Sequence, residues 1–168
     1  MIAVGIDPGL KGAVVAVGED EKLLGWWDAP TLKVRKGKTT REELVPSLMR
    51  DVLCEVPGGA TIFVEVQQAR PKQGRSSTLK TGFGYGLWLG LVVGQGCFRH
   101  ELVQPQAWQR SMLAGRSGDT KARSLQAASA LFPGLPLTKP RGRVPCMDGR
   151  SDAALIALWG LRRMRGGE

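Results

Sequence analysis

Short apolar segments separated by turns open the chain. Residues 2–7 and 13–18 are joined by an Asp-Pro-Gly turn, and residues 22–27 follow an acidic turn. Apolar runs of this length between turn residues predict three antiparallel β-strands. A fourth run at 60–66 is rich in β-branched and aromatic residues, and a fifth strand is expected at 98–104. The pattern therefore predicts five strands.

A stripe of apolar residues at helical spacing over 44–56 predicts the first helix. Thr40 and Glu43 have the spacing of a capping box, so this helix is expected to begin near Thr40 unless Pro46 kinks it or delays its start. The preceding segment, 29–39, is predicted to be a basic loop. Its charges either contact phosphate or lie in solvent.

Four later helices are predicted at 78–96, 105–113, 121–131 and 149–164. The first has glycine at every fourth position, which leaves one face almost without side chains (Gly82, Gly86, Gly90 and Gly94). We expect that face to pack closely against another element, in a central buried helix. The last helix is almost continuously apolar through Trp159 and is also expected to be buried.

The order of these elements predicts an α/β fold with one mixed five-stranded sheet, three antiparallel strands followed by two parallel ones, flanked by helices. A helix connects the third strand to the fourth, so the first and fourth strands are expected to pair in parallel. A length of 168 residues suits a single domain over 1–168. No apolar run is long enough to span a bilayer, and the N-terminus lacks the layout of a signal peptide. A cytoplasmic location is therefore expected.

The net charge of +9 is concentrated in the second part of the chain. Residues 1–60 contain eight Lys/Arg and nine Asp/Glu, whereas residues 61–168 contain sixteen and six. A basic half predicts a polyanionic partner, most often nucleic acid, although a basic surface can also serve solubility alone. Two acid-free segments, within 67–82 and 133–147, supply the candidate phosphate contacts: Arg70, Lys72, Arg75, Ser76, Lys80, Arg141 and Arg143.

Carboxylates in unexpected places suggest a metal site. Asp7 ends the first apolar strand and Glu65 lies near the end of the fourth, so parallel pairing would make them neighbours. Asp148 and Asp152 lie four residues apart at the start of the last helix, where one acid would suffice as a cap. Four carboxylates without thiolate or imidazole ligands suit Mg²⁺ or Mn²⁺ rather than zinc. The alternative is four unrelated structural acids.

These motifs, in this order, resemble the RuvC-type Holliday junction resolvases of the RNase H-like superfamily, especially the phage-like branch. The resemblance covers nearly the whole chain and rests on Gly5-Ile-Asp-Pro-Gly9, Phe63-Val-Glu65, the glycine helix 82–94, Val103-x-Pro-x-x-Trp108 and Asp148-x-x-x-Asp-Ala-Ala-Leu155. It implies a homodimer, in a bacterial cell or a phage-infected host, that cuts opposing strands of a four-way DNA junction. It also implies that Asp7, Glu65, Asp148 and Asp152 hold two Mg²⁺ ions per site, with Mn²⁺ able to substitute.

The resemblance draws attention to two basic residues, and the chain departs from the family's pattern at three points. Lys121 matches a lysine near the scissile phosphate. Arg110 stands beside Gln109, where many relatives have lysine. Residues 66–78 contain no aromatic residue that could act as a junction wedge, and the final acid pair is spaced four apart where some relatives use three. These departures bear on substrate preference more than on metal-dependent cleavage.

Three other functions are compatible with parts of this pattern. An RNA-directed relative would cleave RNA–DNA hybrids or process ribosomal RNA. A non-catalytic module would bind junctions without cutting them. A sugar-kinase or actin-like ATPase also begins with a Gly-x-Asp-x-Gly hairpin, but that fold needs two such domains and this chain has room for one. The leading prediction is a metal-dependent nuclease acting on Holliday junctions and other branched DNA.

Overall fold

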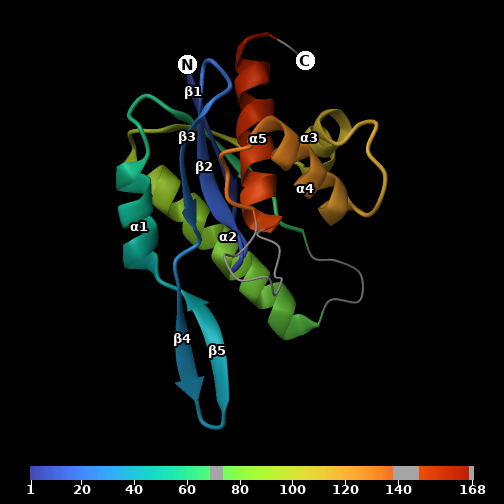
Figure 1. Cartoon of the computed structure of the whole chain (residues 1–168). Helices are drawn as coiled ribbons and strands as arrows, with labels where there is room; N and C mark the ends of the chain where they lie inside the picture. The colour runs from blue at the N-terminus through green and yellow to red at the C-terminus, as the bar shows by residue number, and fades with distance from the viewer. Residues whose placement is uncertain (69–73, 138–147, 167–168) are drawn as a thin grey trace.

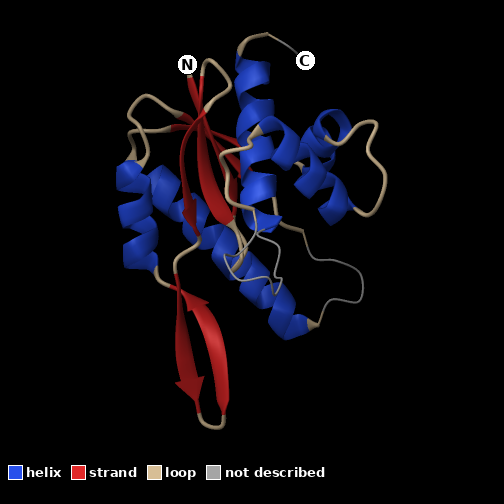
Figure 2. Cartoon of the chain, in the orientation of Figure 1, coloured by secondary structure: helices blue, strands red, loops and turns tan. Residues whose placement is uncertain are grey.

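The computed structural model describes residues 1–68, 74–137 and 148–166. Its centre is a five-stranded sheet (Figures 1 and 2). The strands of this sheet follow the order β3-β2-β1-β6-β7. The strands are β1 (Ile2–Asp7), β2 (Ala13–Gly18), β3 (Leu23–Asp28), β6 (Thr61–Glu65) and β7 (Arg99–Val103). The first three pair antiparallel, whereas β1 with β6 and β6 with β7 pair parallel. The predicted mixed sheet is therefore confirmed.

Helices cover both faces of the sheet (Figure 1). One layer contains α1 (Pro46–Glu55) and α2 (Arg75–Gln95), and the other contains α3 (Pro105–Met112), α4 (Thr120–Leu131) and α5 (Asp148–Met164). Neighbouring residues of a strand point to opposite faces, so Ala3 packs with α5 while Val4 packs with α1 and α2. This burial on both sides explains why β1 and β2 are almost entirely apolar.

The segment predicted as a basic loop and a helix start is instead a β-hairpin. Strands β4 (Thr31–Lys36) and β5 (Thr39–Leu44) pair antiparallel in a separate two-stranded sheet. Gly37 adopts φ +63 at the turn, a conformation that glycine tolerates without strain. The helix begins later, with Pro46 in its first turn, where the missing N–H has no cost. The capping box at Thr40 and Glu43 was thus wrong, and the alternative of a later start is confirmed.

The glycine stripe of α2 faces outward. A Cβ added at Gly82, Gly86, Gly90 or Gly94 would meet nothing within 4 Å among the described residues. The buried side of the helix is formed by Gly84, Trp88 and Val92, while Phe83 is 61% exposed. The prediction that the glycine stripe packs closely against another element is therefore wrong within a single copy of the chain. In the described ranges, neither this helix nor another is long and apolar enough to cross a membrane.

Ion pairs fix both ends of α5 against the β2–β3 hairpin. Near its start, Arg150 donates two hydrogen bonds of 2.6 Å to the Asp28 carboxylate and lies over the Trp26 ring, 3.7 Å from its centroid. At its other end, Arg162 donates to Glu21 and lowers the pKa of that carboxyl. These contacts at the two ends of α5 therefore hold the helix in its position across the sheet.

We expect Arg150→Gln to lower the free energy of unfolding by about 2 kcal/mol. The Arg150 side chain is only 10% exposed, and glutamine cannot replace its paired bonds to Asp28 or its stacking on Trp26. Urea unfolding followed by circular dichroism measures the change. Arg163→Gln is the matched control, because Arg163 pairs with Glu101 at an exposed site where about 0.5 kcal/mol is expected. Equal losses in the two variants would contradict the prediction.

Candidate active site

Asp7 and Glu65 end neighbouring strands at the same edge of the sheet. The register pairs Ile6 with Val64 in parallel, so the next residue of each strand is an acid. Asp7 Oδ1 accepts a hydrogen bond of 3.2 Å from the Gly9 N–H, inside the tight turn between β1 and β2. This turn follows the strand end directly and leaves the carboxylate at the surface edge of a buried strand. The parallel pairing expected from the sequence is thus confirmed.

The Glu65 carboxylate is held by two side-chain donors. Its Oε1 accepts from the Trp108 indole Nε1 and its Oε2 from Gln67 Nε2, both at 2.9 Å. Glu65 is 8% exposed and Trp108 is fully buried in α3, so the indole bond fixes the orientation of the acid. The sequence placed Trp108 in a motif but gave no sign that it contacts Glu65.

Asp152 lies on the second turn of α5 and accepts a short hydrogen bond from the Ser124 hydroxyl of α4. Two close backbone contacts place this helix against the first hairpin. A Cβ at Gly149 would lie 2.1 Å from the Lys11 carbonyl oxygen, and a Cβ at Gly5 would lie 2.1 Å from that of Ala153. Only glycine permits these approaches.

Asp148, the fourth predicted ligand, is the first residue of α5. Its backbone therefore starts the same helix that presents Asp152. Its side chain is outside the described part of the structure.

One pocket unites three of the five predicted catalytic residues. Glu65, Lys121 and Asp152 line a hollow of about 420 Å³, to which β6, α4 and α5 each contribute one of them. Lys121 is in the first turn of α4, whose start is fixed by Asp119 accepting a 2.8 Å hydrogen bond from the Ala122 N–H. Glutamines fill much of the remaining wall (Gln67, Gln68, Gln106 and Gln109). A lysine that shares a pocket with two carboxylates suits a phosphodiester held near a cation.

The predicted metal ligands of this site are of the chemical type that binds a hard cation. Asp7, Glu65 and Asp152 offer only carboxylate oxygens, the ligands that Mg²⁺ and Mn²⁺ prefer. Within residues 1–68, 74–137 and 148–166, no three acidic, histidine or cysteine side chains lie close enough to hold one ion together. Ion binding by the set that includes Asp148 therefore stays a prediction.

The predicted phosphate contacts lie in different places. Arg75 and Ser76 are exposed in the first turn of α2, and Lys80 lines a separate hollow with Glu42 and Glu43 of β5. Four others, Arg70, Lys72, Arg141 and Arg143, are outside the described residues. None of the three members of this group that the structure describes lines the acid pocket, whereas Lys121 does.

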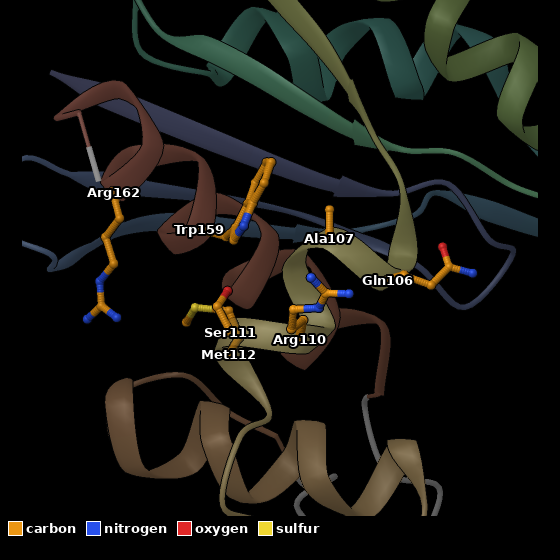
Figure 3. Close-up of a pocket in the computed structure, with 7 residues that line it drawn as sticks. All are labelled: Gln106, Ala107, Arg110, Ser111, Met112, Trp159 and Arg162. Carbon is orange, nitrogen blue, oxygen red and sulfur yellow. The ribbon is translucent and has the colours of Figure 1, made fainter. Parts of the chain in front are cut away.

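Arg110 lines a second and larger cavity, of about 800 Å³, between α3 and α5 (Figure 3). Its wall contains Trp159 and Arg162 but no acid among the described residues. Gln106 lines both this cavity and the acid pocket, so α3 separates the two. Arg110 is thus near the site, on the other side of the helix.

Solved structures share this arrangement of sheet and helices. Thermus thermophilus RuvC, solved in complex with a Holliday junction substrate, matches 99% of this chain and 97% of its own with a TM-score of 0.59 and 16% identity. The chain has the RuvC fold. The yeast mitochondrial Holliday junction resolvase Ydc2 matches 95% of this chain and 77% of its own, with a TM-score of 0.55 and 22% identity. The resemblance seen in the motifs is thus confirmed at the level of the fold.

A sequence relationship accompanies the RuvC fold over part of the chain. The chloroplastic Holliday junction resolvase MOC1 of Chlamydomonas reinhardtii is 37% identical over 100 residues. The match spans 59% of this chain and 11% of that protein, so the chain corresponds to a small part of this relative. No family model matches the sequence.

Proposed function

We propose that the chain is a divalent-metal-dependent endonuclease that resolves Holliday junctions and also cuts other branched DNA. The observation that supports this most directly is the pocket in which Glu65, Lys121 and Asp152 meet, beside the strand end with Asp7. The RuvC fold and the similarity to MOC1 favour a four-way junction as substrate. The basic half of the chain favours a polyanion of this kind.

In this proposal Asp7, Glu65, Asp148 and Asp152 hold the cations. Two bound Mg²⁺ ions would supply an activated water and charge stabilisation for phosphodiester hydrolysis. Trp108 and Gln67 orient Glu65, and Ser124 orients Asp152, so both acids enter the reaction already placed. Lys121 binds a phosphate oxygen and positions the backbone to be cut.

A panel of labelled substrates tests the proposal: a four-way junction, a three-way junction, a linear duplex and an RNA–DNA hybrid of matched length. We expect Mg²⁺-dependent cleavage of the four-way junction, less of the three-way junction, and none in EDTA. Preferential cleavage of the hybrid would replace the proposal with an RNA-directed nuclease. Tight junction binding without cleavage in Mg²⁺ or Mn²⁺ would replace it with a binding module.

We also propose that two copies pair through the outward face of α2. This face combines the four exposed glycines with Leu79 and Val93, which are 74% and 53% exposed. A bare apolar helix face allows close approach of a second helix, and a symmetric pair uses the same patch on both copies. Paired active sites would then cut both opposing strands of one junction.

The double variant Gly86→Glu with Gly90→Glu is expected to sediment as a monomer where the wild type sediments as a dimer. Each added side chain has open space in one copy, so the change opposes pairing rather than folding. Analytical ultracentrifugation measures the mass. The control Gly58→Glu with Gly134→Glu adds the same charge at open turn positions and should stay dimeric. A dimeric α2 variant, or a monomeric wild type, would contradict the prediction.

A further inference from the structure

The β4–β5 hairpin, residues 31–44, extends away from the body of the molecule (Figure 1). Its strands pair with each other and not with the five-stranded sheet. A two-stranded hairpin is at best marginally stable in water by itself, so contacts with a partner would stabilise such an arm. We call it the basic hairpin.

Positive charge surrounds the outer part of the basic hairpin. Residues 33–41 contain five Lys/Arg and no acid, and the two acids of the hairpin, Glu42 opposite Lys33 and Glu43 opposite Leu32, lie nearer its root. Opposite pairs in the register share a face, so Lys33 and Arg35 lie on one face while Arg41, opposite Val34, lies on the other. Lys38 is exposed at the tip. Cations on both faces suit a partner that surrounds the arm with negative charge, rather than an apolar protein surface.

The root of the basic hairpin is tied to the edge of the sheet that presents the acids. The Ala29 N–H donates to the Gly12 carbonyl at 2.9 Å, and the Val45 N–H donates to the Pro30 carbonyl at 3.0 Å. Helix α2 is in close contact with both parts, since a Cβ at Gly84 would lie 2.9 Å from the Pro8 oxygen and 3.1 Å from Leu44. The arm therefore leaves the molecule beside the turn that follows Asp7.

The dimensions of the basic hairpin match a duplex. Six residues per strand span roughly 20 Å, a length over which one DNA strand presents about six phosphates. A two-stranded β-ribbon also fits the major groove of B-form DNA. Contacts of Lys and Arg with phosphates would set the position of the duplex without reading its sequence.

We propose that the basic hairpin grips one duplex arm of the DNA substrate next to the active site. The proposal rests on the function proposed above for the identity of the substrate. It assigns a DNA-binding role to Lys33, Arg35, Lys38 and Arg41, outside the acid pocket. The arm positions the DNA and takes no part in the hydrolysis.

The test compares two triple variants that lose the same charge. Lys33→Gln, Arg35→Gln and Arg41→Gln neutralise the basic hairpin, whereas Lys22→Gln, Arg50→Gln and Arg99→Gln neutralise exposed residues elsewhere. Fluorescence anisotropy in EDTA measures the Kd for a four-way DNA junction, for a linear DNA duplex and for duplex RNA of equal length. Salt is varied from about 50 to 200 mM.

We expect the hairpin variant to bind both DNA substrates at least tenfold more weakly than the control variant. Its slope of log K against log salt should be smaller by about 2 to 3, since each lost phosphate contact removes nearly one unit. Lys38→Gln alone, at the tip and outside the strands, should weaken binding by about threefold. Circular dichroism checks that all variants retain the wild-type spectrum.

Equal weakening in the two triple variants would overturn the proposal, because the effect would then be one of total charge. Unchanged binding in the hairpin variant, or a loss confined to RNA, would overturn it as well. A wild type that binds junctions but does not cleave them in Mg²⁺ would instead contradict the proposed function. The comparison of the two triple variants would remain decisive in that case, since it needs no cleavage.

Discussion

Asp7→Asn is expected to reduce junction cleavage by at least about a thousandfold, which corresponds to about 4 kcal/mol of transition-state stabilisation. Asparagine keeps the oxygen that accepts the Gly9 N–H, so the turn after β1 should persist. It removes the negative charge that the proposed metal site needs. Single-turnover cleavage of a labelled four-way junction at saturating protein measures the rate.

Asp20→Asn is the matched control for this prediction. Asp20 is exposed in the turn between β2 and β3, at the other end of the strands from Asp7, and pairs with Lys22. The same chemical change there should leave the rate within about twofold of wild type. If the Asp7 variant cleaves the junction as fast as the Asp20 variant does, Asp7 is not part of the active site.

Gly5→Ala is expected to lower the free energy of unfolding by about 3 kcal/mol or more. The added Cβ would lie 2.1 Å from the Ala153 oxygen and 2.6 Å from the Ala157 nitrogen, and backbone atoms of a buried helix cannot yield cheaply. Because α5 presents Asp152, its displacement should also slow cleavage in the fraction that folds. Urea unfolding followed by tryptophan fluorescence measures the stability.

The control is Gly58→Ala, in the turn before β6, where an added Cβ meets nothing within 4 Å. That change should alter stability by no more than about 0.5 kcal/mol. If the two variants unfold at the same urea concentration, the close contact between β1 and α5 does not exist in solution.

The central sheet and the position of Asp7 and Glu65 at the ends of neighbouring strands were predictable because local patterns and topology agreed. The alternation of apolar runs with turns defined β1, β2 and β3, and the helical connection required parallel pairing of β1 with β6. Parallel pairing in turn brings the strand ends at Asp7 and Glu65 together. These are consequences of chain geometry that need no knowledge of distant side chains.

The hairpin at 31–44 was not predictable in the same way. Leu32 and Val34 alternate with charged residues in β4, but β5 has no apolar residue before Leu44, so the second strand of the pair lacks the apolar alternation that identifies a half-buried strand. Thr40 and Glu43 happened to have the spacing of a helix cap, and Leu44 extended the helical stripe by one position. Pro46 indicated the observed start of the helix, because proline is favoured in the first turn of a helix.

Side-chain partners across long sequence separations also escaped prediction. The bonds from Trp108 to Glu65 and from Ser124 to Asp152 join residues that are 43 and 28 positions apart. No periodicity shows which residue a buried acid contacts. The glycine stripe of α2 had a similar ambiguity, because its spacing identified a bare face without showing whether the chain itself covers that face.

The closed root of the basic hairpin has a consequence for how such proteins diversify. The Val45 N–H bond to Pro30 brings both ends of the hairpin together, so the segment between them can change in length or composition while its attachment stays constant. Insertions of this kind are tolerated because they leave the core unaltered. If the arm grips DNA as proposed, exchanging residues 31–44 for other arms would be a route to new DNA preferences without altering the central sheet.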